Sequence, residues 1–406
     1  MNDELSNKSL KIDKSNWQSV KLGSLAGEIS QRIDNPSKSE YERFVGLEHF
    51  VSGDFKIKNW GTTENLVSAM KVFQIGDILF ARRNAYLRRA SIVDFDGVCS
   101  GDAFVLRENH DRIVPGFLAF IVNSDELWDY ANANAAGTMS KRVKWRDLAE
   151  YKFLLPPKEQ QARLAELLWA ADEVVENLNS LISSLQTAYQ SNIDHEILGF
   201  SPNGFKIKEL LKQLSEKNTL KPLGELGLFM KGKGIAKDET KSEGIPCVRY
   251  GELYTRHDIV IREFNSFINE ASAINSLLLM QNDLVMAGSG ETREDIGKTA
   301  VMNKEIRAYA GGDVIVFRPS KMKGTFLSYV MNSTLGKQQL GQRGTGATIF
   351  HIYPDELKKI FVPVPSIEAQ NKKVEKLESF YKNISFAEEE LIKSKKLQQA
   401  MLNQIF

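Results

Sequence analysis

The sequence contains very little cysteine and no long apolar run. Two of its 406 residues are cysteines, Cys99 and Cys247, and they fall in different halves of the chain. Two such thiols cannot build a disulfide framework or a thiolate metal cluster, which is typical of a reducing compartment. The longest apolar stretches, such as 117–122, are far shorter than the roughly 18–20 residues that cross a bilayer. With a polar N-terminal segment that lacks a signal-peptide core, this predicts a cytoplasmic protein that does not enter the membrane.

The sequence also lacks an excess of charge of one sign. It contains 53 Lys and Arg residues and 52 Asp and Glu residues, a net charge of +1. This excludes a histone-like basic coat and an acidic tail, so any nucleic-acid surface must be local. A solitary DNA-binding protein that makes about 6–10 phosphate contacts usually has a clear basic excess. At roughly 150 residues per domain, the length predicts two or three domains.

The chain contains an internal repeat of about half its length, which indicates a tandem duplication. Segment 100–107 (SGDAFVLR) returns as 311–318 (GGDVIVFR), and 117–124 (FLAFIVNS) returns as 326–333 (FLSYVMNS). The other matched segments are 21–25 with 222–226, 76–83 with 282–289, and 155–161 with 364–370. Within each copy, short Val-, Ile-, Leu- and Phe-rich runs bounded by Gly, Asn or Asp predict an α+β module.

A long helix is predicted after each module. In the first copy, apolar residues recur at alternating intervals of four and three without Gly or Pro until Gly199, which is a heptad pattern. Ser366 is a suitable N-cap for the second helix. We expect the two helices to pair through these positions: Leu164, Leu168, Val175, Leu178, Ile182, Leu185, Leu377, Phe380, Ile384 and Leu391. A second apolar stripe, Leu167, Val174, Leu181 and Ala188, suggests a further neighbouring helix.

The order of module, helix, module and helix resembles the specificity subunits of Type I restriction–modification systems. The motifs that carry the resemblance are GDIL (76–79), GTMSKRVKWRDL (137–148) and LPPKEQ (155–160), with degenerate copies GATIFHIYPDEL (346–357) and VPSIEAQ (364–370). The last copy departs from the usual double-proline form, which leaves the start of the second helix less defined. The resemblance implies two tandem α/β target recognition domains and an antiparallel coiled coil. The expected limits are 1–155 for the first domain, 156–198 for its helix, 199–220 for a linker, 221–364 for the second domain and 365–406 for the second helix.

The resemblance also implies a function in DNA methylation and phage defence. Each domain would bind one half of an asymmetric bipartite site in double-stranded DNA, and the chain would direct two methyltransferase subunits, with or without restriction and translocase subunits, to that site. It would be non-catalytic and bind no cofactor, with S-adenosylmethionine, ATP and Mg on its partners.

Candidate DNA contacts are the basic and polar residues of predicted loops, because Arg, Lys, Asn and small polar groups bind base edges and phosphates. In the first module they are Arg82, Arg83, Asn84, Tyr86, Arg88 and Arg89 in 81–89, and Lys141 and Arg142 in 140–146. In the second they are Lys231, Lys233, Arg249, Tyr250, Ser289, Thr292, Arg293, Arg343 and Thr345. The alternatives are a surface segment with ion pairs inside the module for 81–89, packing of the module against its helix for 140–146, and ordinary turns for the second set.

Sequence motifs for enzymatic activity are missing. Segment 290–299 resembles a phosphate-binding loop, but Thr292 occupies the position that requires glycine. The five histidines lack metal-ligand spacing, and GxSxG and HExxH do not occur. Two alternatives to a DNA-specificity subunit remain. One is a duplicated coiled-coil scaffold that binds proteins without sequence-specific DNA recognition, and the other is a self-sufficient enzyme.

Overall fold

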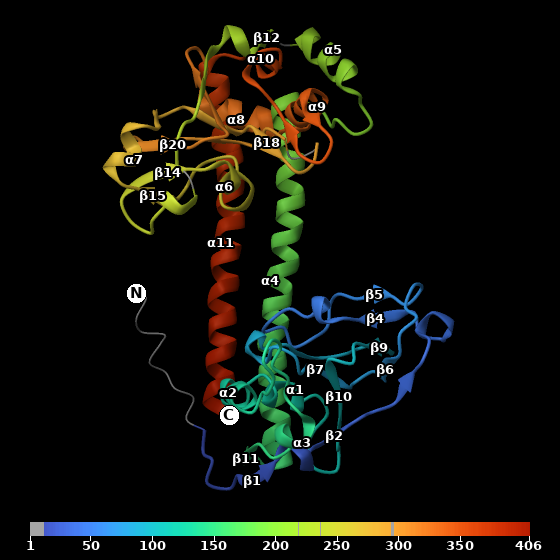
Figure 1. The fold of residues 1–406 in the computed structure, drawn as a ribbon. Helices are drawn as coiled ribbons and strands as arrows, with labels where there is room; N and C mark the ends of the chain where they lie inside the picture. The colour runs from blue at the N-terminus through green and yellow to red at the C-terminus, as the bar shows by residue number, and fades with distance from the viewer. Residues whose placement is uncertain (1–11, 218, 236, 294–295) are drawn as a thin grey trace. The chain divides into compact units, whose positions relative to one another are not determined.

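The computed structural model describes residues 12–217, 219–235, 237–293 and 296–406 (Figure 1). Residues 1–11 of the expected first domain, residue 218 of the expected linker, and residues 236, 294 and 295 of the expected second domain lie outside the described part. The chain forms two compact units: unit 1 is Met1–Ser180 with Glu388–Phe406, and unit 2 is Leu181–Ala387. Each unit therefore contains one module and parts of both long helices.

The module of unit 1, here the first module, is built on three sheets. A four-stranded sheet has the order β2-β10-β7-β8, a five-stranded sheet has the order β3-β6-β9-β4-β5, and β1 pairs with β11. The strands are β1 Gln18–Lys21, β2 Ala26–Glu28, β3 Arg32–Ile33, β4 Arg43–Val45, β5 Gly61–Thr62, β6 Met70–Phe73, β7 Ile78–Ala81, β8 Ala90–Ile92, β9 Gly97–Cys99, β10 Ala103–Glu108 and β11 Lys152–Leu155.

The module of unit 2, here the second module, repeats this plan. Its sheets have the orders β13-β21-β17-β19, β15-β14-β20-β16 and β12-β24, and a small additional sheet has the order β18-β23-β22. The strands are β12 Leu220–Pro222, β13 Gly227–Lys231, β14 Ile245–Val248, β15 Ser266–Ile268, β16 Leu277–Leu279, β17 Leu284–Ala287, β18 Ser289–Gly290, β19 Thr299–Val301, β20 Ala308–Ala310, β21 Val314–Pro319, β22 Thr345–Gly346, β23 Phe350–His351 and β24 Phe361–Pro363. In both modules the second sheet contains one parallel pair, β4 with β9 and β14 with β20.

The central strands are continuously apolar because both of their faces are covered. In β7, Ile78 and Phe80 belong to the core beneath the helices, while Leu79 belongs to the core shared by the two sheets. In β17, Leu284 and Met286 lie on the helix side, and Val285 lies on the other side. Successive side chains alternate between faces of a sheet, so the repeated apolar runs predicted from the sequence are sandwiched strands.

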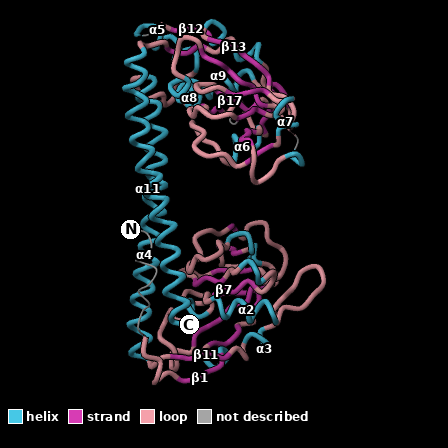
Figure 2. Tube along the Cα trace, turned by 90° about the vertical axis from the view of Figure 1, so that its left-hand side faces the viewer, coloured by secondary structure: helices cyan, strands magenta, loops and turns pink. Residues whose placement is uncertain are grey.

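The helices are short inside the modules and long after them (Figure 2). Their bounds are α1 Leu118–Ile121, α2 Asp125–Ala133, α3 Trp145–Leu148, α4 Lys158–Leu198, α5 Ile207–Lys217, α6 Tyr250–Thr255, α7 Glu270–Ile274, α8 Gly324–Asn332, α9 Thr334–Arg343, α10 Pro354–Leu357 and α11 Ile367–Ile405. Helix α4 ends at Leu198 and is followed by Gly199, whose φ of +77° favours glycine and whose N–H donates to the carbonyl of His195. At the start of α11 the predicted N-cap is confirmed, because the Ser366 Oγ accepts a hydrogen bond from Ala369 N.

Helices α4 and α11 pair antiparallel through the predicted positions. In unit 1, Leu168 of α4 shares a core with Leu402 and Ile405 at the end of α11. In unit 2, Tyr189 of α4 stacks on Phe380 of α11, with ring centroids 5.9 Å apart. All ten predicted pairing residues are buried or half-buried. By contrast, Leu167, Val174 and Leu181 of the second stripe are 42%, 50% and 47% exposed.

A glutamine ties the start of each long helix to its own module. Gln161 accepts a hydrogen bond from Val114 N (2.9 Å) and donates to the carbonyl of Pro156 (2.9 Å). Gln370, 209 positions later, accepts from Lys323 N (2.9 Å) and donates to the carbonyl of Pro365 (2.9 Å). The equivalent bonds explain why the glutamine recurs in the second helix entry, although one of the two prolines does not.

The predicted linker 199–220 contains a helix. Within it, Leu210 and Leu214 of α5 are buried in the core of unit 2, so this interval packs against the second module. Both cysteines are buried and free, and burial raises the pKa of each thiol to about 12. In the part of the chain that the structure describes, no helix combines the length and apolarity needed to cross a membrane.

Candidate nucleic-acid interface

Two predicted DNA-binding segments meet in the first module. Arg83 follows β7, and its backbone pairs with that of Arg142, which in turn pairs with Ala136. The turn between Ala136 and Arg142 contains Gly137, whose φ of +131° and close approach to the carbonyl of Ser140 exclude a Cβ atom. Arg83, Ala136 and Arg142 thus form a small three-stranded arrangement, here called the first corner. It brings together residues that lie 59 positions apart.

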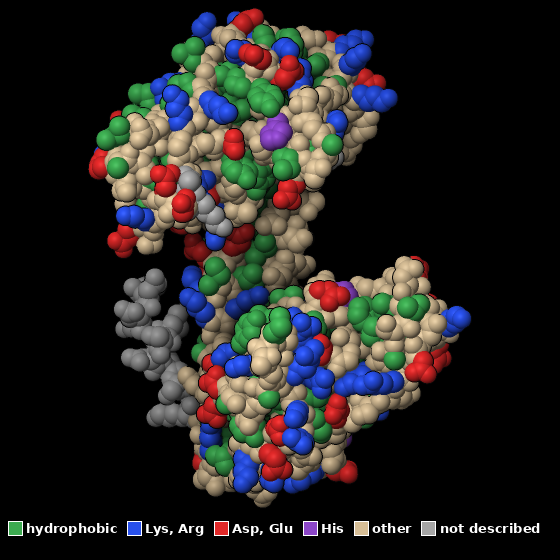
Figure 3. All heavy atoms as spheres, in the orientation of Figure 1, with side chains coloured by type: hydrophobic (Ala, Val, Ile, Leu, Met, Phe, Trp, Pro, Cys, Tyr) green, Lys and Arg blue, Asp and Glu red, His purple; other side chains and the backbone are tan. Residues whose placement is uncertain are grey.

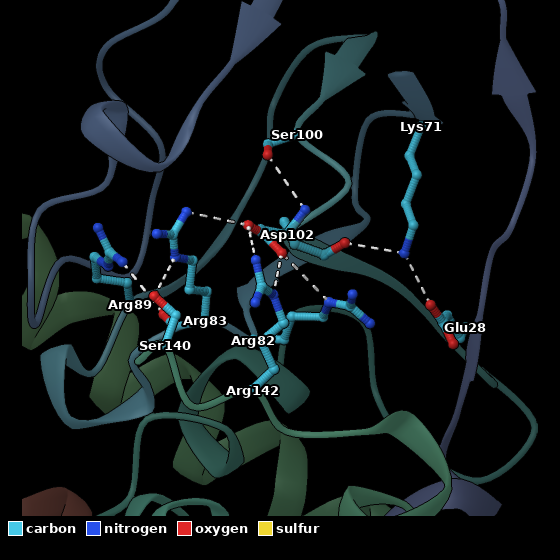
Figure 4. Close-up of polar contacts among 10 residues, drawn as sticks. Glu28, Lys71, Arg82, Arg83, Arg89, Ser100, Asp102, Ser140 and Arg142 are labelled. Atoms are coloured by element: carbon cyan, nitrogen blue, oxygen red, sulfur yellow. Dashed lines mark hydrogen bonds and ion pairs between the residues drawn. The ribbon is translucent and has the colours of Figure 1, made fainter. Parts of the chain in front are cut away.

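The carboxylate of Asp102 is surrounded by three arginines: Arg83 and Arg142 of the first corner, and the neighbouring Arg82 (Figure 4). Arg142 donates to Asp102 through Nε (2.8 Å) and Nη2 (3.2 Å). The Arg82 Nε and the Arg83 Nη1 lie 3.8 and 3.6 Å from the same carboxylate. Because three positive charges share one negative charge, the cluster has a net charge of +2. These hydrogen bonds from Arg142 lower the pKa of Asp102 despite its partial burial, and the charges of Arg82 and Arg83 act in the same direction.

The guanidinium groups of the cluster remain accessible. The side chains of Arg82, Arg83 and Arg142 are 32%, 42% and 41% exposed. Lys and Arg side chains gather on the face of unit 1 that Figure 3 shows. A half-exposed arginine can bind a phosphate or a guanine edge without leaving its internal partner, because guanidinium has five donors in a fixed fork.

The remaining candidate DNA contacts of the first module differ in how free their side chains are to bind DNA. Tyr86 is 67% exposed, and Lys141 is exposed. Asn84 has a φ of +55°, and its N–H donates to the carbonyl of Lys141 (2.9 Å), which joins the two loops. Arg88 forms ion pairs with Asp125 and Asp129 of α2.

Arg89 is engaged inside its own module. Its Nη1 donates to the carbonyl of Leu47 (2.9 Å). Burial lowers the pKa of its guanidinium. For Arg88 and Arg89, the contacts present are therefore those of the alternative interpretation, a segment with polar contacts inside the module.

The second module has a corner with the same pairing and different side chains. Backbone pairs join Ser289 to His351 and His351 to Thr345 across β18, β23 and β22. The Ser289 Oγ and the His351 Nδ1 lie within hydrogen-bonding distance, 2.9 Å. Gly346, with a φ of +142°, makes the equivalent turn. Ser289, Thr345 and His351 are here called the second corner.

A cavity of about 430 Å³ adjoins the second corner. Ser289, Tyr250 and Tyr254 line it together with Ile349, and the Tyr254 hydroxyl donates to the carbonyl of Ser289 (2.7 Å). Tyr250, one of the predicted contacts, is 44% exposed at the start of α6. The structure thus brings two predicted contacts together at an opening with aromatic walls.

The other candidates of the second module are more dispersed. Lys231 ends β13, and both Lys231 and Lys233 are exposed. Thr292 is exposed, and the guanidinium of Arg293 lies 5.1 Å from the centre of the Phe350 ring, next to His351 in β23. Arg249 lies 3.6 Å from Glu252 at the start of α6.

Arg343 is the last residue of α9. Its Nη1 donates to the carbonyl of Gln339 (3.0 Å) and its Nη2 to that of Lys359 (3.2 Å). The side chain of Arg343 therefore holds together two parts of its own module, and it is less available for DNA than the residues of the corner.

The prediction from sequence missed Asp102 and His351. Asp102 occurs in SGDAFVLR and its counterpart Asp313 in GGDVIVFR, so the recurrence of an acid in both copies was a usable signal. His351 lies 209 positions after Arg142 and Ser289 lies 206 after Arg83, the same shifts as in the surrounding motifs. The two corners are therefore equivalent positions of the duplication.

Residues shared by the two copies are structural. Arg107 forms two 2.8 Å hydrogen bonds with buried Asp77, and Arg318 forms equivalent bonds of 2.8 and 2.7 Å with buried Asp283. These pairs join neighbouring strands of the central sheets, so the scaffold recurs while the corner side chains differ. In the described residues, no group of His, Cys, Asp and Glu side chains has the geometry of a metal site.

The fold and the repeated helix entries define a class of proteins with two α/β modules, each followed by a long helix. Residues 215–395 match the family described as the Type I restriction modification DNA specificity domain. The EcoDI specificity subunit of Escherichia coli is 24% identical to the chain over 191 residues, which are 46% of this chain and 42% of that protein. The MjaVIII specificity subunit of Methanocaldococcus jannaschii is 22% identical over 292 residues, 68% of this chain and 65% of that protein.

The fold extends over nearly the whole chain. A solved structure described as the structural basis of complex assembly and conformational transition of the type I R-M system aligns over 98% of both chains, with a TM-score of 0.60 and 22% identity. The chain is therefore similar in sequence to specificity subunits of Type I restriction–modification systems, and it shares the fold of the solved type I R-M structure. It aligns with about 42–65% of the length of the two curated relatives described above.

Proposed function

We propose that this chain is the DNA-specificity subunit of a Type I restriction–modification system and that each module binds one half of an asymmetric bipartite site. The observation that carries the proposal is the pair of corners. Equivalent positions hold Arg83 and Arg142 in one module and Ser289 and His351 in the other, on scaffolds with the same strand order. Different donors and acceptors on equivalent scaffolds favour different base sequences.

The DNA contacts in this proposal are members of the predicted set that are exposed or half-exposed. In the first module, Arg83 and Arg142 of the corner and the adjacent Arg82 supply positive charge around Asp102, and Lys141 and Tyr86 flank them. In the second, Ser289 and Tyr250 act at the cavity, with Lys231 and Lys233 available for phosphates. A local positive cluster accounts for DNA binding despite the net charge of +1, because phosphate attraction is a short-range effect at physiological salt.

The partners in this proposal are two methyltransferase subunits, with restriction subunits where the system contains them. The exposed residues Leu167, Val174 and Leu181 of α4 recur every seven residues, and such a repeat supports packing against another helix. The chain itself is proposed to be non-catalytic. S-adenosylmethionine chemistry, and ATP and Mg chemistry where a restriction subunit is present, would belong to the partners.

The test is a map of methylated bases in cells that express the chain together with its modification subunit. A gapped two-part motif that requires this chain is the expected result. If the two proteins copurify but the methylation pattern is the same without this chain, the scaffold function replaces the proposal. Transfer of a labelled methyl group to DNA by the isolated chain would instead establish a self-sufficient enzyme.

A further inference from the structure

Asp102 immediately precedes β10, and hydrogen bonds fix its backbone there. Its N–H donates to the Ser100 Oγ (3.2 Å), and its carbonyl accepts from Arg82 N (3.0 Å). The next residue, Ala103, accepts a 3.0 Å hydrogen bond from Lys71, whose side chain is buried and also paired with Glu28 (Figure 4). The backbone from which the carboxylate extends is therefore fixed, although the carboxylate itself points into an exposed cluster of arginines.

Arg142 is bound by Asp102 along one edge of its guanidinium group. The contacts use Nε and Nη2 (2.8 and 3.2 Å), and no hydrogen bond to Nη1 is present among the described residues. The end of the fork, formed by Nη1 and the outer hydrogen of Nη2, therefore remains available. A guanidinium held by a carboxylate loses less conformational freedom on binding than a free one does.

The charge balance distinguishes Arg142 from its neighbours. Arg142 and Asp102 together are neutral, so their combined attraction for a phosphate is weak. The free end of the fork still matches two neutral acceptors side by side, and guanine N7 and O6 present that pattern in the major groove. Arg82 and Arg83, with longer distances to the carboxylate, carry the remaining charge of +2 and suit phosphates.

We propose that Asp102 is a positioning residue that fixes Arg142 for bidentate recognition of one guanine in the half-site of the first module. This inference rests on the proposed function and adds the base type and the residue that determines it. The equivalent acid of the second module, Asp313, is exposed and forms no ion pair among the described residues, so the arrangement belongs to the first module alone.

The experiment uses the full chain assembled with its modification subunits. The probes are duplexes that carry the motif obtained from methylation mapping, in which each guanine in turn is replaced by 7-deazaguanine to remove the N7 acceptor. We expect one replacement to weaken binding by the wild-type complex by about 10- to 100-fold. For the Asp102→Asn complex, the same replacement should change affinity less than about threefold, because Arg142 is no longer fixed.

Affinity for duplex DNA of unrelated sequence provides a second measurement. If Asp102 only stabilised the fold, its replacement would not raise this affinity. Asp102→Asn removes a negative charge from among three arginines, so affinity for unrelated duplex should stay equal or rise while guanine discrimination falls. Arg142→Lys keeps the charge and removes the fork, and it should lose the same discrimination. Asp313→Asn, the matched control, should retain the wild-type profile.

The failure of this inference is separate from the failure of the proposed function. A wild-type complex without sequence preference overturns both. A wild-type complex that binds its motif specifically, while both Asp102→Asn and Arg142→Lys keep full sensitivity to every 7-deazaguanine, overturns the inference alone. Loss of affinity for all DNA by both variants equally, with the discrimination ratio unchanged, also overturns it.

Discussion

Some equivalent positions of the duplication hold the same residue in both copies, and others hold different residues. The shared aspartates and arginines form ion pairs with a buried carboxylate, whereas the residues at the corners differ. The Asp77–Arg107 and Asp283–Arg318 pairs recur because a buried carboxylate requires a fixed partner. Arg142 and His351 occupy equivalent backbone positions, yet one carries a guanidinium group and the other an imidazole ring. The residues that recur build the scaffold, and those that differ are the candidates for specificity.

The buried His257 predicts that the stability of unit 2 depends on pH. It is 4% exposed, and its Nε2 has no hydrogen-bond partner in the described part of the chain. Burial lowers the pKa of His257, Lys298 adds to this effect, and Glu252 opposes it. The unfolded chain therefore binds a proton that the folded unit does not, below the ordinary histidine pKa of about 6.5. Unit 2 should lose stability as the pH falls from about 7 to 5.

The measurement is thermal unfolding across this pH range, monitored by tryptophan fluorescence and by circular dichroism. All five tryptophans lie in the part of the sequence that forms unit 1, so tryptophan fluorescence reports on unit 1 and circular dichroism on both units. His257→Gln should reduce the pH-dependent shift of the unfolding temperature seen by circular dichroism, because the glutamine side chain binds no proton in this range. His195→Gln, at an exposed position, serves as the control. An unchanged shift in His257→Gln would contradict the assignment.

At the scale of elements, the heptad pattern of α4 separates core positions from surface positions. Leu168 is fully buried with Leu402 and Ile405 of α11, whereas its neighbour Leu167 is 42% exposed. The same helix therefore offers one face to α11 within unit 1 and a second apolar stripe to solvent. The first face stabilises the fold, and the second supports the proposed binding of another protein.

Leu168→Ala should destabilise unit 1 by about 2–5 kcal/mol, because it removes buried methyl groups and leaves a cavity. Leu167→Ala should change the free energy of unfolding by less than about 1 kcal/mol, since its side chain is half in solvent and alanine favours the helix. Urea unfolding monitored by tryptophan fluorescence measures both. Equal losses in the two variants would show that the pairing face has been assigned wrongly.

Leu167→Ala has a second use in the complex. If the exposed stripe binds the modification subunits, this substitution should reduce copurification with them and leave the stability of the chain nearly unchanged. Leu168→Ala is the opposite case, because any loss of copurification there would accompany a loss of stability. The pair of variants thus separates folding from partner binding.

At the scale of the whole molecule, the two corners belong to different compact units. Substitutions in different compact units that share no interaction partners are expected to act independently. The combination Ser289→Ala with His351→Ala removes the hydrogen-bonded pair of the second corner. We expect it to relax or change the methylation motif in one half-site and leave the other half-site and the spacer as in the wild type.

Arg83→Ala in the first corner is the matched comparison for this experiment. It should alter the opposite half-site, and combining the substitutions of both corners should alter both halves without new changes. Mapping methylated bases for the four chains measures this directly. A single-corner variant that changes both half-sites, or the spacer, would contradict independent recognition by the two modules.

Parts of the site could be predicted from the sequence because they depend on local composition. The arginines after β7 and the polar residues after β17 were identified as loop residues at strand ends. Asp102 could not be assigned to Arg142 in this way, because 40 residues separate them and only the folded sheet brings the carboxylate to the loop. Arg88, Arg89 and Arg343 show the converse, since their composition suits DNA and their contacts lie inside the module.

The duplication, the apolar central strands and the heptad pattern of the long helices can be predicted from the order of residues alone, because repetition and periodicity are properties of that order. The sequence also indicated the family through the repeated helix entries, where Gln161 and Gln370 make equivalent bonds. The folded chain alone shows which arginines share Asp102, that helix α5 (Ile207–Lys217) packs against the second module, and that equivalent corners carry different side chains. These depend on contacts between distant segments, whose geometry is fixed by packing rather than by local pattern.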